Sequence, residues 1–111
     1  MGIQEFIPLI KEVIIDISNE DYNKLNQKYE YSRVSIDDLA KTIKQYGNHI
    51  VPLPERAFDF AEKYYIESEK RIDVYLPLWT KEEGKSDLTL SISYYNNESE
   101  LYIEINDLRV L

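Results

Sequence analysis

Asp107 is the residue of this 111-residue chain whose setting most favours acid–base chemistry. Residues 96–99 are typical of a hairpin loop, and pairing outward from it places Asp107 opposite residue 88, on an aliphatic face. A desolvated carboxylate there holds its proton more tightly and can serve as a general base. The alternative is a bulge at 106–107, favoured by the phase of the apolar residues that follow, which turns Leu108 inward and leaves Asp107 at the rim.

Other catalytic and ligand-binding chemistries lack their residues. The chain has no cysteine, a single histidine (His49), no glycine-rich phosphate loop and no Gly-x-Ser-x-Gly motif. A lone histidine without co-ligands is typical of a surface or capping residue, and the spacing of Glu82, Glu83 and Asp87 matches no calcium-binding loop. The sequence therefore predicts a protein that is not an enzyme and has no catalytic residue, no metal and no cofactor.

The net charge of −8 is unevenly distributed along the chain. Residues 51–111 carry thirteen acids and seven bases, a net charge of −6. An acidic field repels phosphate backbones and accelerates encounter with basic partners. The charge therefore predicts a basic protein partner and no nucleic acid, because there is also no Lys/Arg cluster. Selection for solubility alone is the alternative explanation of the charge.

Aromatic side chains are expected to alternate with acids on the outward face of the strands. Tyrosine and tryptophan with few lysines mark recognition surfaces, since rigid rings lose little entropy on binding. The strand propensity of tyrosine is the competing explanation of its high content. The candidate partner-binding residues are Tyr75, Trp79, Ser91, Tyr102 and Glu104 on that face, and Glu82, Glu83 and Asp87 in the loop 80–87.

Helices are expected in residues 1–47 and strands in residues 62–111. Over residues 3–17 the apolar side chains recur at spacings of three and four, which is one stripe of an amphipathic helix. Asn19 can cap a short second helix that runs from Glu20 to about Gln27. Two helices therefore precede the segment around residue 30.

A third helix has the clearest boundaries. Ser35 and Asp38 form an acidic variant of the capping box, and Gly47 supplies the left-handed residue that ends the helix. Residues 48–61 contain two prolines and are interpreted as a crossing loop, with a short turn at Glu55–Phe60.

From residue 62 the apolar period changes to two, which predicts a meander of four antiparallel strands. The loop 80–87 is longer than a usual hairpin loop of about two to five residues, and Gly84 supplies a positive φ within it. One sheet face is aliphatic and should lie under the helices. The expected fold class is α+β, with three N-terminal helices packed on a four-stranded antiparallel sheet in a single domain of residues 1–111. The four predicted strands are 62–68, 70–79, 88–95 and 101–110.

The N-terminal apolar segment is neither a signal peptide nor a membrane span. Charged residues such as Glu5, Lys11, Glu12 and Asp16 interrupt it, and it has no basic leader. The absence of cysteine fits a reducing compartment. We therefore expect a cytoplasmic protein without a membrane partner.

The last forty residues carry a specific motif. It consists of Pro-Leu-Trp-Thr at 77–80, Glu-Glu-Gly at 82–84, Ser-Asp-Leu-Thr-Leu at 86–90 and Asp-Leu-x-Val-Leu at 107–111. In these residues the chain resembles an uncharacterised family of small bacterial proteins, a resemblance that implies no known activity.

The order of helices followed by a curved meander also looks like the cone-shaped fold of nuclear transport factor 2 and ketosteroid isomerase, or a cystatin-like sheet. Those isomerases use a carboxylate base and a tyrosine donor inside the cone, and the resemblance implies Asp107 and Tyr94 for these roles. Fold likeness does not transfer function. In size and charge the chain is similar to immunity proteins of bacterial toxin systems.

The leading hypothesis is an immunity protein that neutralises a basic toxin domain by direct binding. Tyr75 and Trp79 would be its anchors, and Glu82, Glu83 and Asp87 would steer and pair with basic groups. The alternative is a small-molecule-binding protein or an isomerase or hydrolase of the nuclear transport factor 2 type with Asp107 as base. A homodimer whose two sheet faces cover each other is the third possibility.

Overall fold

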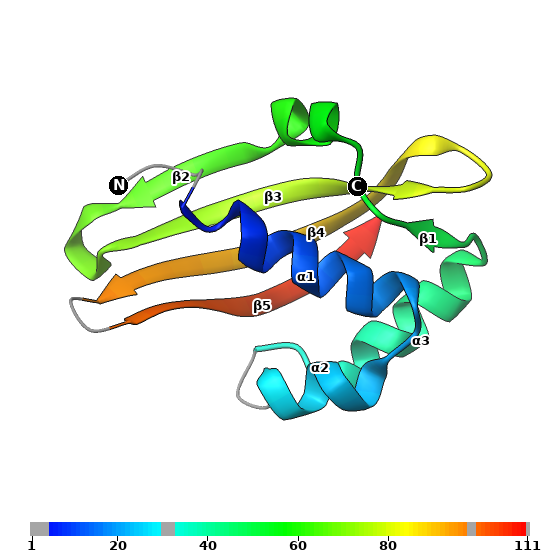
Figure 1. The fold of residues 1–111 in the computed structure, drawn as a ribbon, viewed down its shortest axis with the longest axis horizontal. Helices are drawn as coiled ribbons and strands as arrows, with labels where there is room; N and C mark the ends of the chain where they lie inside the picture. The colour runs from blue at the N-terminus through cyan, green and yellow to red at the C-terminus, as the bar shows by residue number, and fades with distance from the viewer. Residues whose placement is uncertain (1–4, 30–32, 98–99, 111) are drawn as a thin grey trace.

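The computed structural model describes residues 5–29, 33–97 and 100–110, and Figure 1 shows their arrangement. The fold class is α+β, as predicted, with helices ahead of an antiparallel sheet. That sheet has five strands instead of the expected four. In chain order the elements are α1 (Ile7–Ser18), α2 (Tyr22–Lys28), α3 (Ile36–Tyr46), β1 (Ile50–Val51), the 3-10 helix η2 (Glu55–Phe60), β2 (Glu62–Ile66), the 3-10 turn η3 (Glu67–Glu69), β3 (Arg71–Thr80), β4 (Gly84–Asn97) and β5 (Glu100–Val110).

The strand order is β1-β3-β4-β5, and β2 also pairs with β3. Both short strands lie along one side of β3, since β1 pairs with Trp79 and Thr80 while β2 pairs with residues 71–75. The expected crossing loop therefore contains a strand, which two residues are too short to reveal by periodicity. Residues 76–78 of β3 face neither short strand, so Pro77 occupies a position where its missing N–H breaks no ladder on that side.

The helix boundaries follow from local capping. Ser35 Oγ accepts a hydrogen bond from the Asp38 backbone N–H at 3.1 Å, and Gly47 ends α3 with φ of 88°, both as predicted. The predicted cap of α2 is wrong: Asp21 Oδ1 accepts from Lys24 N at 3.3 Å, whereas Asn19 ends α1. Asparagine and aspartate both cap well, so composition alone did not distinguish them.

The predicted alternation of the strands is confirmed on the face that packs against the helices. Figure 1 shows α1 lying across this face of the sheet. Leu76 and Ile92 are fully buried and belong to the same hydrophobic core cluster as the apolar stripe of α1. Burial of such side chains contributes about 25 cal/mol per Å² of apolar surface removed from water. The buried strand residues of this inner face are Ile72, Val74, Leu76, Leu78, Leu88, Leu90, Ile92, Tyr94, Ile103, Ile105 and Leu108.

A bulge in β5 changes the predicted register between β4 and β5. Ser91 faces Asp107 while Ile92 faces Ile105, so Asn106 is the extra residue. The strands run on to Asn97 and Glu100, and the predicted loop tip at 98–99 lies outside the described residues. The direct register, with residue 107 opposite residue 88, is therefore wrong. The bulge alternative is confirmed, because Leu108 is turned into the core.

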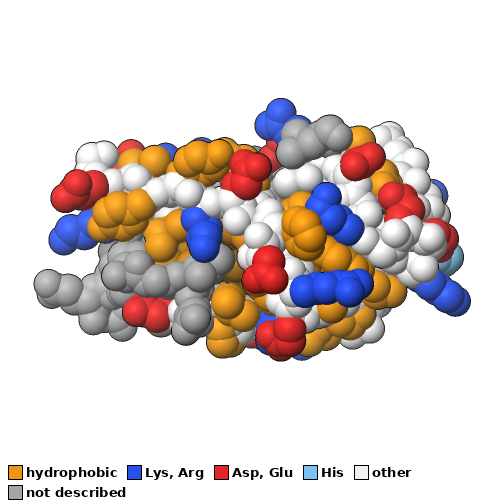
Figure 2. Space-filling view, turned by 90° about the horizontal axis from the view of Figure 1, so that it is seen from above, with side chains coloured by type: hydrophobic (Ala, Val, Ile, Leu, Met, Phe, Trp, Pro, Cys, Tyr) orange, Lys and Arg blue, Asp and Glu red, His pale blue; other side chains and the backbone are white. Residues whose placement is uncertain are grey.

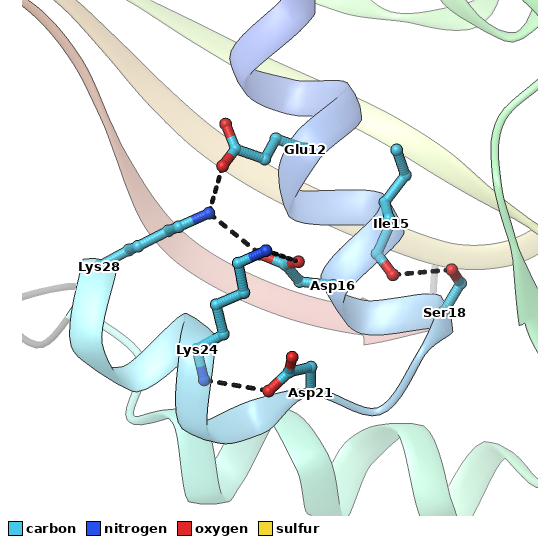
Figure 3. A network of polar contacts seen from close by, with 7 residues as sticks. All are labelled: Glu12, Ile15, Asp16, Ser18, Asp21, Lys24 and Lys28. Atoms are coloured by element: carbon cyan, nitrogen blue, oxygen red, sulfur yellow. Dashed lines mark hydrogen bonds and ion pairs between the residues drawn. The ribbon is translucent and has the colours of Figure 1, made fainter.

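A buried carboxylate joins α1 to α2. The side chain of Asp16 is only 4% exposed, and its two oxygens lie 3.6 Å from Lys24 Nζ and 3.4 Å from Lys28 Nζ. Figure 3 shows both lysines of α2 reaching toward α1, where Lys28 also contacts Glu12. The hydrogen bond to Glu12 is the main cause of the raised pKa of Lys28. This network compensates the burial of a charge on the inward stripe of α1.

Replacing Asp16 by alanine should lower the free energy of unfolding by about 1–3 kcal/mol, because two lysines lose their shared acceptor. Urea denaturation of the purified protein followed by circular dichroism measures this change. Glu12→Gln is the matched control, since Glu12 forms a more exposed pair with the same Lys28 and should cost less than about 1 kcal/mol. If the two substitutions lowered the free energy of unfolding equally, Asp16 would not be the residue that holds α1 and α2 together.

Candidate partner-binding face

The sheet side turned away from α1, α2 and α3 is here called the outer face. In the observed register Asp73 lies opposite Ser93, Tyr75 opposite Ser91, and Pro77 opposite Thr89. The outer-face residues that the argument uses are Glu62, Tyr64 and Ile66 on β2, Asp73, Tyr75, Pro77 and Trp79 on β3, Thr89, Ser91 and Ser93 on β4, and Glu104, Asp107 and Arg109 on β5.

A groove of about 520 Å³ runs along β2 and β3 on this face. In the register of these strands, Glu62 lies opposite Tyr75 and Tyr64 lies opposite Asp73, so that each acid stands across from an aromatic ring. The rings of Tyr64 and Tyr75 meet edge to face with centroids 5.7 Å apart. The groove is lined by Phe60, Glu62, Tyr64, Ile66, Asp73, Tyr75, Pro77 and Thr89.

Hydrogen bonds hold the acids of the groove in place. Asp73 Oδ1 accepts from Ser93 Oγ at 2.7 Å and from Arg71 Nε at 3.1 Å. The Tyr64 hydroxyl donates to Glu62 Oε2 at 3.1 Å, and this bond raises the pKa of Tyr64. The orientation of Asp73 is thus fixed from beneath by Ser93, which is itself buried.

A second, smaller hollow of about 250 Å³ adjoins the groove. It shares Tyr75 and Thr89 with the groove, so Tyr75 forms the wall between the two. Asp107 Oδ2 lies 2.6 Å from Arg109 Nε in this hollow, which couples the acid to a base. The hollow is lined by Tyr75, Thr89, Ser91, Asp107 and Arg109.

Asp107 and Tyr94 lie on opposite faces of the sheet. Asp107 stands beside Ser91 on the outer face, whereas the ring of Tyr94 is fully buried on the inner face and stacks on Phe6 at 4.3 Å. Burial raises the pKa of Tyr94. The expected base–donor pair is therefore not formed, because the bulge at Asn106 reverses the direction of the residue that follows it.

Trp79 points to the outer face but is only 7% exposed. The ring of Phe60 from η2 covers it with centroids 6.0 Å apart. The role of Trp79 as a partner anchor is therefore corrected to that of a buried support for η2. The sequence did not reveal this contact, since Phe60 and Trp79 are far apart in the chain and η2 carries no strand periodicity.

The expected long loop 80–87 is a tight hairpin. Thr80 pairs with Gly84, so that the turn contains only residues 81–83, and Gly84 adopts φ of 73°, the left-handed position of a three-residue hairpin. The remaining residues extend β4 as a bulge, where Leu78 faces residues 86–88. Ser86 Oγ fills this bulge by donating to Leu78 O at 2.8 Å and accepting from Leu88 N at 3.2 Å.

Glu82 and Glu83 bind the chain's own α3–β1 connection. Glu82 accepts from the His49 backbone N–H at 2.8 Å and contacts His49 Nδ1 at 2.8 Å. Glu83 Oε2 accepts from the Tyr46 hydroxyl at 3.0 Å, and its other oxygen contacts Asn48 Nδ2. Both carboxylates therefore anchor the turn, and their role in steering and pairing with basic groups stays a prediction. Hydrogen bonds from His49 lower the pKa of Glu82, while burial and then Glu83 raise the pKa of Tyr46.

The remaining predicted site residues lie apart from the groove. Tyr102 is 38% exposed and stacks on Tyr95 with centroids 4.8 Å apart. Glu104 pairs with Arg33 Nε at 3.1 Å, and Asp87 is exposed on the bulge of β4. The structure therefore brings Tyr75 and Ser91 together and separates Tyr102 and Asp87 from them. Tyr64 and Asp73 were missed as site residues: Asp73 has the same phase as Tyr75 along β3, which could have found it, whereas the sequence of β2 has no alternation that singles out Tyr64.

Figure 2, seen from the side that carries β2 and η2, shows hydrophobic groups at the surface between acids and bases.

Within the described ranges, no cluster of three or more His, Cys, Asp or Glu side chains is arranged to hold a metal ion. In the same part of the chain, every helix is too short or too polar to cross a membrane.

A family model described as a domain of unknown function, DUF7668, matches residues 14–111, which include the whole sheet and both hollows. The chain belongs to this family. The prediction that the chain belongs to an uncharacterised family is therefore confirmed. No curated protein and no solved structure matches the chain.

In this DUF7668 protein, acid should release the 81–83 turn. Because the folded pKa of Glu82 is lowered, its stabilising contribution is present above the unfolded pKa and is lost as the pH falls through the folded value. The melting temperatures of the wild type and of Glu82→Gln should therefore differ at pH 7 and converge as the pH is lowered to 3. Glu67→Gln, at an exposed glutamate of η3, is the control, and a difference that persists unchanged at pH 3 would contradict the proposed contact.

Proposed function

We propose that this protein binds a basic protein partner through its outer face. An immunity protein that neutralises a basic toxin domain by direct binding is the most concrete form of this function. The observation that carries the proposal is the groove on a sheet face away from the helices, where Tyr64 and Tyr75 stand across from Asp73 and Glu62. Aromatic rings beside carboxylates suit the lysine and arginine side chains of such a partner.

The long-range charge and the local groove act on different steps of association. The net charge of −8 would accelerate encounter with a basic domain, and the acids held in the groove would fix its orientation. Tyr75 is the expected anchor, because it is 38% exposed and lines both hollows. Ser91, next to it, would contribute a hydroxyl at the wall of the smaller hollow.

A small-molecule or enzymatic function of the nuclear transport factor 2 type is the second candidate. The hollow around Asp107 and Ser91 is the observation in its favour. With about 250 Å³ it is below the usual 300–1,000 Å³ of ligand pockets, and Arg109 already pairs with the acid. Direct binding of a protein is therefore the function that we place first.

Capture of a partner by the immobilised protein from cells of its source organism tests the first function. We expect a basic protein that is released as salt rises from about 0.1 to 1 M, where the Debye length falls from about 10 to 3 Å. Replacing Tyr75 by alanine should weaken its binding at least about tenfold, the loss typical of a buried aromatic anchor. The affinity of the purified partner, measured by calorimetry, provides this comparison.

Tyr65→Ala is the matched control for this experiment. Tyr65 is a tyrosine of β2 that is 56% exposed, but it pairs with Ile72 and so has the opposite phase to Tyr64. Its substitution should leave the affinity unchanged. A partner that tolerates Tyr75→Ala, or that loses affinity equally with Tyr65→Ala, would contradict binding through the outer face.

A further inference from the structure

The residues that line the groove between β2 and β3 suit the binding of one cationic side chain. Three aromatic rings line it (Phe60, Tyr64 and Tyr75), together with two carboxylates (Glu62 and Asp73), and no lysine or arginine is among its lining residues. A cation over an aromatic face gains electrostatic attraction from the ring quadrupole, and more when it is partly desolvated. An ordinary exposed ion pair would lack the aromatic rings.

The chain itself shows that a ring of this groove accepts a cation. Lys85 Nζ lies 5.3 Å from the centroid of the Phe60 ring at the end of the groove near Trp79. This distance is within the range of about 6 Å for an energetically useful contact. Tyr64 and Tyr75, whose rings meet edge to face, have no such contact among the described residues. The middle of the groove is therefore the part left for a cation from outside.

The carboxylate of Asp73 is oriented but not saturated. Its two hydrogen bonds, from Ser93 and from Arg71, both end on Oδ1, and Oδ2 has none within the part of the chain that the structure describes. Arg71 also pairs with Glu69, so this base is shared between two acids. Glu62 has the same asymmetry, because the Tyr64 hydroxyl donates to Oε2 alone. Each acid thus keeps an oxygen for a further donor.

Resting on the proposed function, we infer that the groove binds one arginine side chain of the partner protein, with its guanidinium packed against the Tyr64–Tyr75 ring pair and its N–H groups directed at Asp73 and Glu62. Arginine fits better than lysine for a geometric reason. A planar guanidinium stacks on rings and presents several donors in a fixed fork, whereas an ammonium is a compact and strongly hydrated point charge. Asp73 and Glu62 lie diagonally across the β2–β3 pair. A guanidinium, with several N–H groups, can donate to both carboxylates at once.

Titration of the ¹⁵N-labelled protein with the peptide acetyl-Gly-Arg-Gly-amide tests this inference without a partner. We expect saturable shifts of the amide signals of Tyr64, Asp73 and Tyr75, with a dissociation constant of about 1–10 mM for a single side chain. The citrulline peptide has the same shape without the charge and should bind at least about tenfold more weakly. The lysine peptide should bind with intermediate affinity.

Variants locate the site. Asp73→Asn should weaken binding of the arginine peptide about three- to tenfold, and so should Tyr64→Ala, which removes a ring that is 52% exposed and leaves the core intact. Asp37→Asn is the control, because it removes the same charge from the first turn of α3. The inference is overturned if the arginine and citrulline peptides bind equally, if Asp37→Asn weakens binding as much as Asp73→Asn, or if the shifts lie away from the groove.

The same variants separate this inference from the proposed function. A basic partner that tolerates Tyr64→Ala but is lost on Tyr102→Ala would bind the outer face elsewhere, so the proposed function would stand and the arginine site would fail. Saturable binding of the arginine peptide with no basic partner found would leave the arginine site standing and would remove the proposed function.

Discussion

The pairing of β3 with β4 is the constraint on which the rest of this structure depends. Leu76 lies opposite Leu90, and Val74 opposite Ile92, so that a continuous aliphatic surface forms on one side of the sheet. Because side chains alternate along a strand, the same pairing places Tyr75 and Ser91 together on the other side. A slip by one residue would exchange the two surfaces and leave α1 without its apolar partner. The core and the outer face are thus two consequences of one register.

Two bulges interrupt the regular pairing of the sheet, one between β3 and β4 and one between β4 and β5. Beside the 81–83 turn, Leu78 faces three residues of β4, and Ser86 compensates the broken ladder with its hydroxyl. Near the C-terminus, the extra residue Asn106 allows Ile105 and Leu108 both to enter the core. The bulge of β5 keeps Leu108 inside where a strict alternation would have exposed it, whereas the bulge of β4 leaves the phase of its buried residues unchanged. Function is affected as well, since the second bulge determines that Asp107 belongs to the outer face.

The parts of the fold that depend on local chemistry could be predicted from the sequence. The stripe of α1, the cap at Ser35, the end at Gly47 and the alternation of β3 and β4 all express periods or capping preferences of neighbouring residues. The parts that depend on contacts between distant segments could not. The cover of Trp79 by Phe60 joins segments without a shared pattern, and the register of β5 required the position of a bulge that two alternatives left open.

The acids of the outer face and those of the turn have different structural roles, although the sequence presents them alike. The carboxylate oxygens of Glu82 and Glu83 contact Tyr46, Asn48 and His49. Removal of these carboxylates would therefore destabilise the fold.

Asp73 is held by Ser93, and Asn106 Nδ2 donates to that same serine at 2.7 Å, which forms a polar chain across a sheet. Asn106 Oδ1 is buried in this chain with no partner within the described residues, a costly arrangement for stability alone. Natural sequences depart from the most stable solution chiefly at functional sites. The polar chain lies beneath the groove of the proposed arginine site, under the carboxylate of Asp73, where such a departure is expected.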